Sequence, residues 1–334
     1  MNAFYSLIFV FALVLIALFG VGAAHLSYFF GVILPLAAVI VFIVGIVLKV
    51  LGWGKSAVPF RIPTTGGQQQ SLDWIKQNKW DNPSTASQTF IRMVFEVLFF
   101  RSLFRNTSVS LRNEDGVPVV AYSSAKWLWL FALMFHYSFL IIVLRHLRLF
   151  MDPVPFFVPV LDFMDGILQI GAPRLYMSDL LIVVGLSFLL LRRLVVPIFR
   201  YISNAADYFP LLLILGIALS GIYMRYFGKV DVIAIKELTM GLVTLSPKVP
   251  AGIDASFYVH IALVSTLLIY FPFSKLMHMG GVFLSPTRNM PNNTRIVHHE
   301  NPWNPDVKPH SYEAYEDDFR EHMIEAGLPV EKQA

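Results

Sequence analysis

The stretch WLWLFALMFHYSFLIIVLRHLRLF, residues 127–150, is apolar almost throughout and contains two histidines, His136 and His146. About 20 consecutive apolar residues are enough to cross a bilayer as one helix. The rest of the chain has the same character, because 56% of its 334 residues are hydrophobic and only 14% are charged. Soluble proteins carry about 25% charged residues. The sequence therefore predicts a protein that crosses a membrane several times.

A second apolar stretch, FYVHIALVSTLLIYFPFSKLMH at residues 257–278, contains His260 and ends at His278. An imidazole inside hydrocarbon is costly, so it is usually kept there by a partner. Two histidine pairs on two apolar segments predict two haem groups, each held between two imidazoles. The chain has no cysteine, which excludes disulfides, thiolate-bound iron–sulfur clusters and covalently attached haem. These features predict an electron-carrying cytochrome of the b type.

Six apolar stretches have the length of a membrane-spanning helix, which predicts an all-α membrane protein with six spans. The first stretch lacks a preceding basic region, so we expect a retained span rather than a cleaved signal. The six predicted spans are Phe4–Ala24, Tyr28–Val50, Trp127–Phe150, Leu180–Phe199, Pro210–Phe227 and Phe257–Met277.

The distribution of Lys and Arg predicts the orientation of these spans. Six spans put both termini on one side, and basic residues are enriched in the cytoplasmic segments of membrane proteins. With both termini inside, 19 of the 26 basic residues are cytoplasmic and 7 are not. We therefore expect a multi-pass protein of the cytoplasmic membrane with both termini in the cytoplasm.

The apolar pattern divides the chain into four regions. The long loop contains a shorter apolar stretch, Phe90–Phe104, that is interrupted by charged residues. We expect it to form an amphipathic helix at the cytoplasmic interface; a seventh span, which would invert the topology downstream, is the alternative. The regions are an N-terminal transmembrane hairpin (1–52), a cytoplasmic loop with this interfacial helix (53–125), a dihaem domain (126–280) and a cytoplasmic tail (281–334).

The tail is acidic from Glu300 onward, with nine acidic and three basic residues. Residues Ser311–Gly327 have the composition of a short acidic helix. Two interpretations stay open: a solvated tail, or a strap that docks a peripheral cytoplasmic subunit.

The spacing of the four histidines predicts which of them share a haem. His260 and His278 are five helical turns apart and face the same direction on a continuous helix. Antiparallel spans then pair His136 with His278 near the cytoplasm and His146 with His260 near the outer face. The helical rise is roughly 15 Å from His136 to His146 and roughly 27 Å from His260 to His278, so the two spans separate their histidines by different heights. A kink at Pro272 is expected to absorb part of this difference.

Two arginines, Arg145 and Arg148, flank His146. They are either interfacial anchors or cofactor-binding residues that pair with haem propionates or orient a quinone carbonyl. The histidines themselves have other interpretations: hydrogen bonds between helices, or a path for protons or metal ions. A transport path would usually add intramembrane carboxylates, and the predicted spans contain almost none. A haem-free membrane anchor and a transporter are therefore the competing functions.

The arrangement His-x9-His followed by His-x17-His, within about Ala121–Gly280, resembles the γ (cytochrome b) subunit of respiratory nitrate reductase. This resemblance implies a four-helix haem-binding core. The later segments SPTRNMPNNTR (residues 285–295) and NPWN (residues 301–304) resemble DsrM, the dihaem cytochrome b family of the DsrMKJOP complex of dissimilatory sulfur metabolism. The chain departs from the nitrate reductase pattern in its N-terminal hairpin, long loop and long tail.

The resemblance implies further expectations about function. It implies that His136, His146, His260 and His278 are the ligands of two haem b irons, and that menaquinol reacts near the outer pair. It also implies a cytoplasmic iron–sulfur partner related to heterodisulfide reductase, together with other membrane and periplasmic redox subunits. Sulfate respiration is the implied context, with no nucleic-acid partner. The direction of electron flow is left open, because two haems in series conduct either way.

Overall fold

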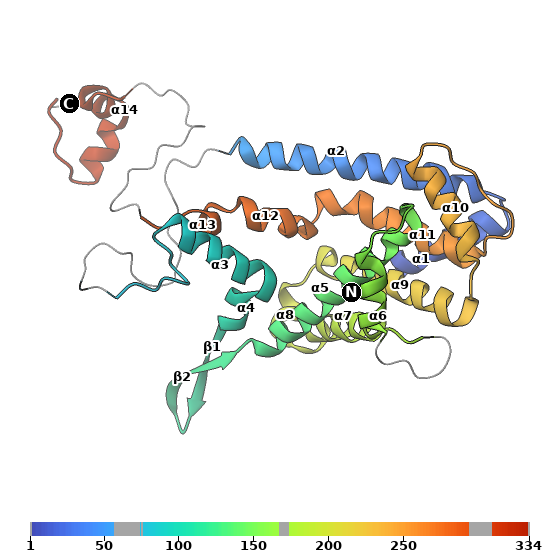
Figure 1. The fold of residues 1–334 in the computed structure, drawn as a ribbon. Helices are drawn as coiled ribbons and strands as arrows, with labels where there is room; N and C mark the ends of the chain where they lie inside the picture. Colours follow the sequence, from blue (N-terminus) through green and yellow to red (C-terminus); the bar gives the residue numbers. More distant parts are fainter. Residues whose placement is uncertain (1, 57–73, 75, 167–173, 294–308, 333–334) are drawn as a thin grey trace.

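The computed structural model describes residues 2–56, 74, 76–166, 174–293 and 309–332. Parts of the predicted loop (53–125) and tail (281–334) lie outside the described residues, as does the segment NPWN (residues 301–304). The described residues form a bundle of long helices with short helices and one β-hairpin at its ends (Figure 1). The predicted helical membrane fold is confirmed, although the hairpin makes it mostly rather than entirely α-helical.

The core of the bundle is made of four helices. They pack in the order α5, α7, α9, α11, and each contacts the next. Helices α5 and α11 face each other across the fourth side without such close packing. The bounds are Lys126–Phe150 for α5, Met177–Val195 for α7, Ala205–Tyr223 for α9 and Ala255–Tyr270 for α11. A π-helical turn, Met224–Gly228, extends α9.

A glycine allows α5 and α7 to approach closely. A Cβ atom at Gly185 of α7 would lie 3.1 Å from the backbone nitrogen of Phe135 and 3.2 Å from the carbonyl oxygen of Phe131 on α5. Backbone atoms cannot move aside as a flexible side chain can, so the packing of these two helices depends on the missing side chain.

The N-terminal hairpin consists of α1 (Asn2–Gly22) and α2 (Leu34–Gly54), with a π-helical turn, Phe29–Ile33, before α2. The exposed His25 lies in the tight turn between them, in the left-handed region at φ 54°. Helix α1 packs against α9 and α11, and α2 packs against α11. The hairpin therefore covers the α11 side of the core (Figure 1).

Five of the six predicted spans are long and apolar enough to cross a membrane: Asn2–Gly22, Phe29–Gly54, Lys126–Phe150, Ala205–Gly228 and Ala255–Phe273. The remaining predicted span, Leu180–Phe199, corresponds to the 19-residue helix α7, which carries three charged residues near its ends. It ends at Val195, because Pro197 disfavours a helical conformation at the residue before it. A short helix, α8 (Pro197–Ile202), follows.

The predicted span Phe257–Met277 is interrupted rather than merely kinked. Helix α11 ends at Tyr270 and is followed by a 3₁₀ turn, Phe271–Phe273, that contains Pro272. Ser274 is extended, at φ −119° and ψ 176°, before a second 3₁₀ turn, Lys275–Met277, and α12, His278–Leu284. The five continuous turns expected between His260 and His278 are therefore absent, and this break sets the position of His278.

The predicted loop helix, Phe90–Phe104, is also interrupted. Helix α3 (Ala86–Phe99) begins at Thr85, whose side chain accepts a hydrogen bond from the backbone of Gln88. It ends where Phe100 adopts the left-handed conformation, φ 49° and ψ 46°, and α4 (Arg101–Arg105) follows. A span needs about 20 residues, so neither helix is long enough for the alternative of a seventh span.

Two further groups of elements mark the ends of the bundle (Figure 1). We call the first the hairpin end: it carries α3, α4, the antiparallel strands β1 (Thr107–Glu114) and β2 (Val117–Ser124), and α13 (Pro286–Asn289). We call the second the α6 end: it carries α6 (Phe157–Asp165) and α10 (Val232–Val243).

The tail contains the short acidic helix that its composition predicts. Helix α14 (Tyr312–Glu325) begins after Ser311, whose side chain accepts a hydrogen bond from the backbone of Ala314. Gly327, at φ 69°, follows its end. The carboxylate of Glu316 accepts hydrogen bonds from the backbone of Glu331 and Lys332, which folds the last described residues back onto the helix.

Candidate functional site

The four histidines lie as two pairs across the open side of the core, between α5 and the α11–α12 segment. The ring centroids of His146 and His260 are 6.4 Å apart, with 12° between the ring planes. Those of His136 and His278 are 6.1 Å apart, with 81° between the planes. His136 and His146 are separated by roughly 15 Å along α5. The first pair lies toward the α6 end and the second toward the hairpin end.

Hydrogen bonds fix the orientation of three of these rings. The Nδ1 atoms of His136 and His146 each lie 2.7 Å from the carbonyl oxygen four residues earlier on α5. The Nδ1 atom of His278 lies 2.9 Å from the carbonyl oxygen of Lys275. A carbonyl oxygen can only accept, so Nδ1 carries the proton in each ring. In the neutral ring Nε2 is then unprotonated and available as a ligand to a metal ion.

A serine orients the fourth ring, that of His260. The Ser220 hydroxyl donates its proton to the carbonyl oxygen of Ile217 at 2.9 Å, and its oxygen lies 2.9 Å from His260 Nδ1. With the hydroxyl proton donated to Ile217, the serine oxygen accepts from Nδ1, and Nε2 of the neutral ring is again unprotonated. The neighbouring Gly221 leaves room for the ring, because a Cβ atom there would lie 3.4 Å from His260 Cε1.

The two ring separations suit an iron atom between each pair. A bond from an imidazole nitrogen to a metal is about 2 Å long. Two such bonds, together with the distance from the ligating nitrogen to the ring centroid on each side, give a separation of about 6 Å between centroids. Among the described residues, no group of three or more His, Cys, Asp or Glu could hold a bare metal ion. Two opposed imidazoles suit a macrocycle that supplies the other four ligands.

Aromatic residues contact His136, one member of the second pair. The rings of Phe100 and Phe135 make edge contacts with His136 at centroid distances of 4.9 and 4.8 Å. The Tyr137 hydroxyl donates to the carbonyl oxygen of Leu98 at 2.8 Å, which ties α5 to the end of α3. The left-handed turn at Phe100 therefore directs an aromatic ring at one of the candidate ligands.

The two arginines proposed as cofactor-binding residues are paired with carboxylates. Arg145, 8% exposed, donates to Asp162 at 2.9 Å and to Asp165 at 2.6 Å. Arg148 forms an ion pair with Asp162 and donates to the carbonyl oxygen of Arg145. The Arg145 guanidinium also lies 3.3 Å from the ring centroid of Tyr176. The structure thus shows both arginines joining α5 to α6, and their cofactor-binding role stays a prediction.

The carboxylate of Asp162 lies outside the long helices, on α6. Burial acts to raise its pKa, but the hydrogen bond and charge of Arg148, followed by those of Arg145, outweigh this effect and lower the pKa below its usual value. The group is therefore held as an anion, which suits a permanent ion pair between the two helices.

Several residues of the site were missed from the sequence. Asp165 also accepts from the backbone and hydroxyl of Ser178, and Asp179 accepts from the Tyr226 hydroxyl at 2.8 Å. The sequence did contain a signal for Asp165, because the two acids Asp162 and Asp165 follow shortly after Arg145 and Arg148. Ser220 gave no such signal, because serine is common in membrane helices and its neighbour His260 is 40 residues away.

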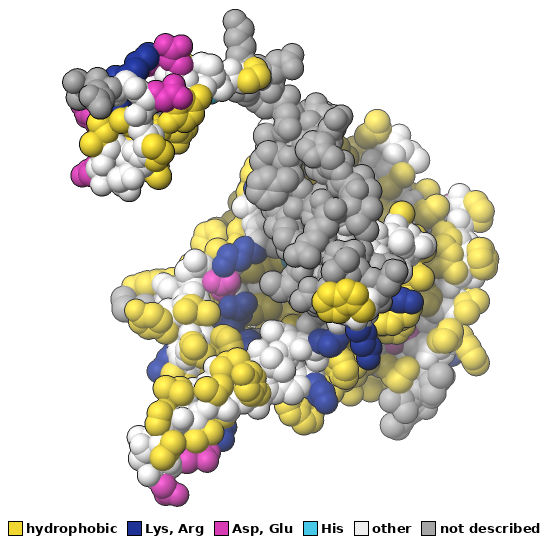
Figure 2. Space-filling model, turned by 90° about the vertical axis from the view of Figure 1, so that its left-hand side faces the viewer, with side chains coloured by type: hydrophobic (Ala, Val, Ile, Leu, Met, Phe, Trp, Pro, Cys, Tyr) yellow, Lys and Arg dark blue, Asp and Glu magenta, His cyan; other side chains and the backbone are white. Residues whose placement is uncertain are grey.

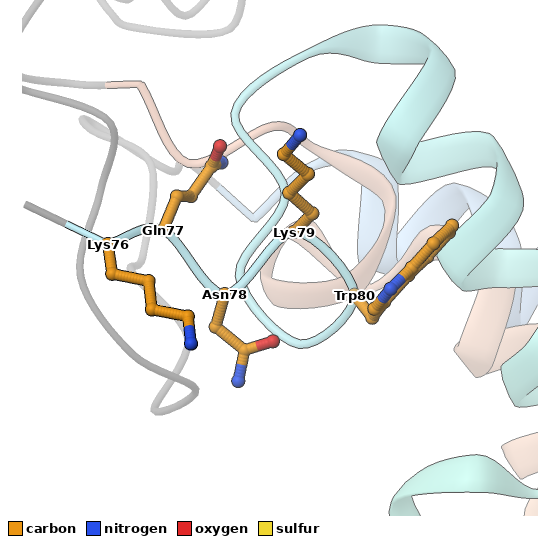
Figure 3. A pocket seen from close by; sticks show the side chains of 5 residues that line it. All are labelled: Lys76, Gln77, Asn78, Lys79 and Trp80. Carbon is orange, nitrogen blue, oxygen red and sulfur yellow. The ribbon is translucent and has the colours of Figure 1, made fainter. Parts of the chain in front are cut away.

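Two surface hollows contain none of the four histidines. Figure 3 shows the first, on the segment before α3; none of the residues that line either hollow is a histidine. They are Lys76, Gln77, Asn78, Lys79 and Trp80 for the first, and Phe95, Phe99, Arg101, Phe104 and Trp129 for the second.

Comparison with known proteins identifies the family. Residues 120–297 match the family of the nitrate reductase gamma subunit. The chain is 48% identical over 283 residues to the Hdr-like menaquinol oxidoreductase cytochrome b-like subunit of Archaeoglobus fulgidus, with 83% of each chain covered. It is 42% identical over 279 residues to the subunit of the same description from Archaeoglobus profundus, covering 81% of this chain and 82% of the other. The matched region contains the four core helices and all four histidines, and the chain belongs to the nitrate reductase gamma subunit family.

Proposed function

We propose that this chain is a membrane electron-transfer subunit with two b-type haems. It exchanges electrons between menaquinol, near the His146–His260 pair, and a cytoplasmic iron–sulfur protein related to heterodisulfide reductase, near the His136–His278 pair. The names of the two Archaeoglobus relatives, which are 48% and 42% identical, support menaquinol as the quinone reactant and an Hdr-like complex as the setting. The resemblance of residues 285–295 to DsrM favours a complex of sulfur metabolism with further membrane and periplasmic redox subunits.

One observation carries the proposal: four imidazoles in two pairs, each with Nδ1 hydrogen-bonded and Nε2 available, at centroid separations of 6.1 and 6.4 Å. A haem held by each pair of imidazoles would supply one-electron transfer chemistry. The protein supplies the ligands, their orientation and an apolar surrounding. A haem-free anchor would not need this arrangement of four oriented rings.

The proposed orientation puts the hairpin end in the cytoplasm. Ten of the 26 basic residues lie in the part of the sequence from Lys49 to Lys126, which ends at the first residue of α5. The positive-inside tendency supports this side, although long loops contribute to it less than short ones. The α6 end then faces outward, so menaquinol would react near His146 and His260.

The experiment is to measure haem content in histidine variants of the purified chain. The wild type is expected to contain two haem b groups and to give a b-type reduced-minus-oxidised spectrum. His146→Ala and His260→Ala should each remove one haem and leave the other, and His136→Ala and His278→Ala should remove the other one. His25→Ala is the matched control, because this exposed histidine lies in a turn.

Two results would contradict the proposal. A wild-type chain without a b-type spectrum would favour a haem-free anchor or a transporter. Full haem content in both His146→Ala and His260→Ala would show that this pair is not a ligand pair. A separate test of menaquinol is whether a menaquinol analogue reduces the haems of the wild type, and whether this reduction is lost in the histidine variants.

A further inference from the structure

The β-hairpin at the hairpin end has one apolar face that nothing in the described structure covers. The strand register places Val109 opposite Tyr122 and Leu111 opposite Val120. Alternate residues of a strand point to the same side, so these four side chains share one face, which we call the hairpin face. They are 61%, 71%, 73% and 52% exposed, in the order named.

The other face of the hairpin is mixed in character. There Arg112 lies opposite Val119 and Glu114 opposite Val117. The strands are joined by Asp115 and Gly116, both with positive φ, at 53° and 86°. This is the backbone that tight hairpin turns require. The hairpin is thus a regular element whose two faces differ, and not an irregular loop.

A two-stranded hairpin is at best marginally stable by itself in water, and it usually needs packing against another element. Figure 2 shows apolar side chains on this projecting part of the molecule, with acidic side chains at its tip. Exposed apolar patches bordered by polar residues mark interaction surfaces. The hairpin face therefore lacks a partner that would complete its packing.

The base of the hairpin is joined to the histidine site. The backbone nitrogen of Ala125 donates to the carbonyl oxygen of Asn106 at 3.2 Å, which closes the hairpin directly before α5. The Trp129 indole donates to the carbonyl oxygen of Phe99 at 2.7 Å. The adjacent residue, Phe100, contacts His136. A protein bound to the hairpin would thus be held at the end of the bundle where His136 and His278 lie.

We propose that the hairpin face docks the soluble iron–sulfur protein that exchanges electrons with this chain. This inference rests on the proposed function and adds the place of contact. The partner would present an apolar patch to Leu111 and Tyr122, bordered by Lys or Arg side chains opposite Glu114 and Asp115. Open strand edges beside the patch could also pair with a strand of the partner.

The acidic tip favours a protein over a lipid surface as the occupant. The cytoplasmic leaflet carries a negative surface potential, which attracts basic segments and repels acidic ones. Glu114 and Asp115 are both exposed at the tip, beside the apolar face. Contact of the whole face with the bilayer would bring these carboxylates to the membrane surface.

The absence of cysteine from the chain permits a clean labelling experiment. A nitroxide is attached to Leu111→Cys on the hairpin face, and to Val117→Cys on the opposite face as a matched control. Each protein is studied as the separate chain in lipid nanodiscs and in the complex purified from host membranes. In the separate chain, the label at 111 should be accessible to a water-soluble nickel relaxation agent. In the complex it should be immobilised and shielded from nickel and oxygen, with little change at 117.

Three results would overturn the proposal. High oxygen accessibility at 111 in the separate chain would show that the face lies in lipid. Dipolar coupling between labels would show that a second copy covers it. An unchanged spectrum in the complex would show that no partner covers it.

A second pair of variants tests the contact without a label. Leu111→Ser combined with Val120→Ser should lower the acid-labile sulfide that co-purifies with the chain by about tenfold or more, as expected for loss of central apolar contacts. Val117→Ser with Val119→Ser is the matched control and should retain the sulfide. Haem per chain should be unchanged in both. A wild-type chain without haem would contradict the proposed function instead. Sulfide retained by both double variants would contradict the docking site.

Discussion

The ring of His146 lies within 12° of parallel to that of His260, at a centroid distance of 6.4 Å. The other pair has a similar separation but nearly perpendicular planes, at 81°. Each ring has a contact at Nδ1: three rings contact backbone carbonyls, and that of His260 contacts Ser220. The two sites are therefore chemically alike but geometrically different.

This difference predicts two distinguishable low-spin signals in the electron paramagnetic resonance spectrum of the oxidised protein. Parallel imidazole planes split the iron d orbitals strongly and give a rhombic signal. Perpendicular planes leave two of these orbitals nearly degenerate and give a highly anisotropic signal. We expect His260→Ala to remove the rhombic signal and His278→Ala to remove the anisotropic one. The reverse assignment, or two identical signals in the wild type, would contradict the ring geometry.

The Ser220 hydroxyl is expected to control binding at the His260 site. Ser220→Ala removes the hydroxyl that contacts His260 Nδ1, so the ring is held less firmly in its orientation. Loss of such a supporting hydrogen bond typically weakens binding by 10–100-fold, and we expect about this reduction in haem affinity at one site. Titration of haem into the apoprotein measures it.

The control for this variant is Ser138→Ala. Ser138 is buried, whereas Ser220 is partly exposed, and the Ser138 hydroxyl hydrogen-bonds to carbonyl oxygens of its own helix and not to a histidine. Ser220→Thr retains a hydroxyl and should restore affinity. Equal loss in Ser220→Ala and Ser138→Ala would mean that the effect is general packing.

The helices of this protein could be predicted because hydrocarbon allows few alternatives. A spanning backbone must form all its hydrogen bonds internally, so a long apolar run implies a helix. Sequence reasoning failed where local geometry decides. The break after Tyr270 was expected only as a kink at Pro272, and the turn at Phe100 uses a conformation that non-glycine residues rarely adopt. The β-hairpin could have been predicted from the sequence, since apolar and polar residues alternate before Asp115–Gly116.

The histidine site could be predicted in part. Antiparallel spans place His136 near His278 and His146 near His260, and these side chains lie side by side in the structure. Their role as haem ligands stays a prediction. The helical periodicity used for His260 and His278 does not apply, because the helix between them is broken. The Ser220 contact depends on the packing of two helices, which no local pattern reveals.

Gly185 is expected to be needed for the contact between α5 and α7. In Gly185→Ala the new Cβ would lie 3.1 Å from backbone nitrogen and Cβ of Phe135, so the helices must separate. Overpacking of this kind usually costs about 1–3 kcal/mol. Thermal unfolding of the purified protein should show a lower midpoint. Gly52→Ala is the control, because no atom lies within 4 Å of the new Cβ; an equal loss there would contradict the prediction.

The ion pair of Asp162 predicts a pH-dependent contribution to stability. Its pKa in the folded protein is lowered, because the hydrogen bond and charge of Arg148, with those of Arg145, outweigh the opposing effect of burial. A lowered pKa stabilises the folded state above the unfolded value, about 3.9 for Asp, and this stability is lost as the pH falls through the folded value. Asp162→Asn should therefore reduce the free energy of unfolding at pH 7, by about 1–3 kcal/mol.

The measurement is thermal unfolding of the detergent-solubilised protein between pH 7 and pH 3. The difference between wild type and Asp162→Asn should shrink below about pH 4, since the wild-type carboxylate becomes protonated and loses its charge attraction to both arginines. Glu237→Gln changes an exposed carboxylate on α10, at the same end of the bundle, and should have little effect at either pH. A difference that persists unchanged at pH 3 would mean that the carboxylate acts through its shape and not through its charge.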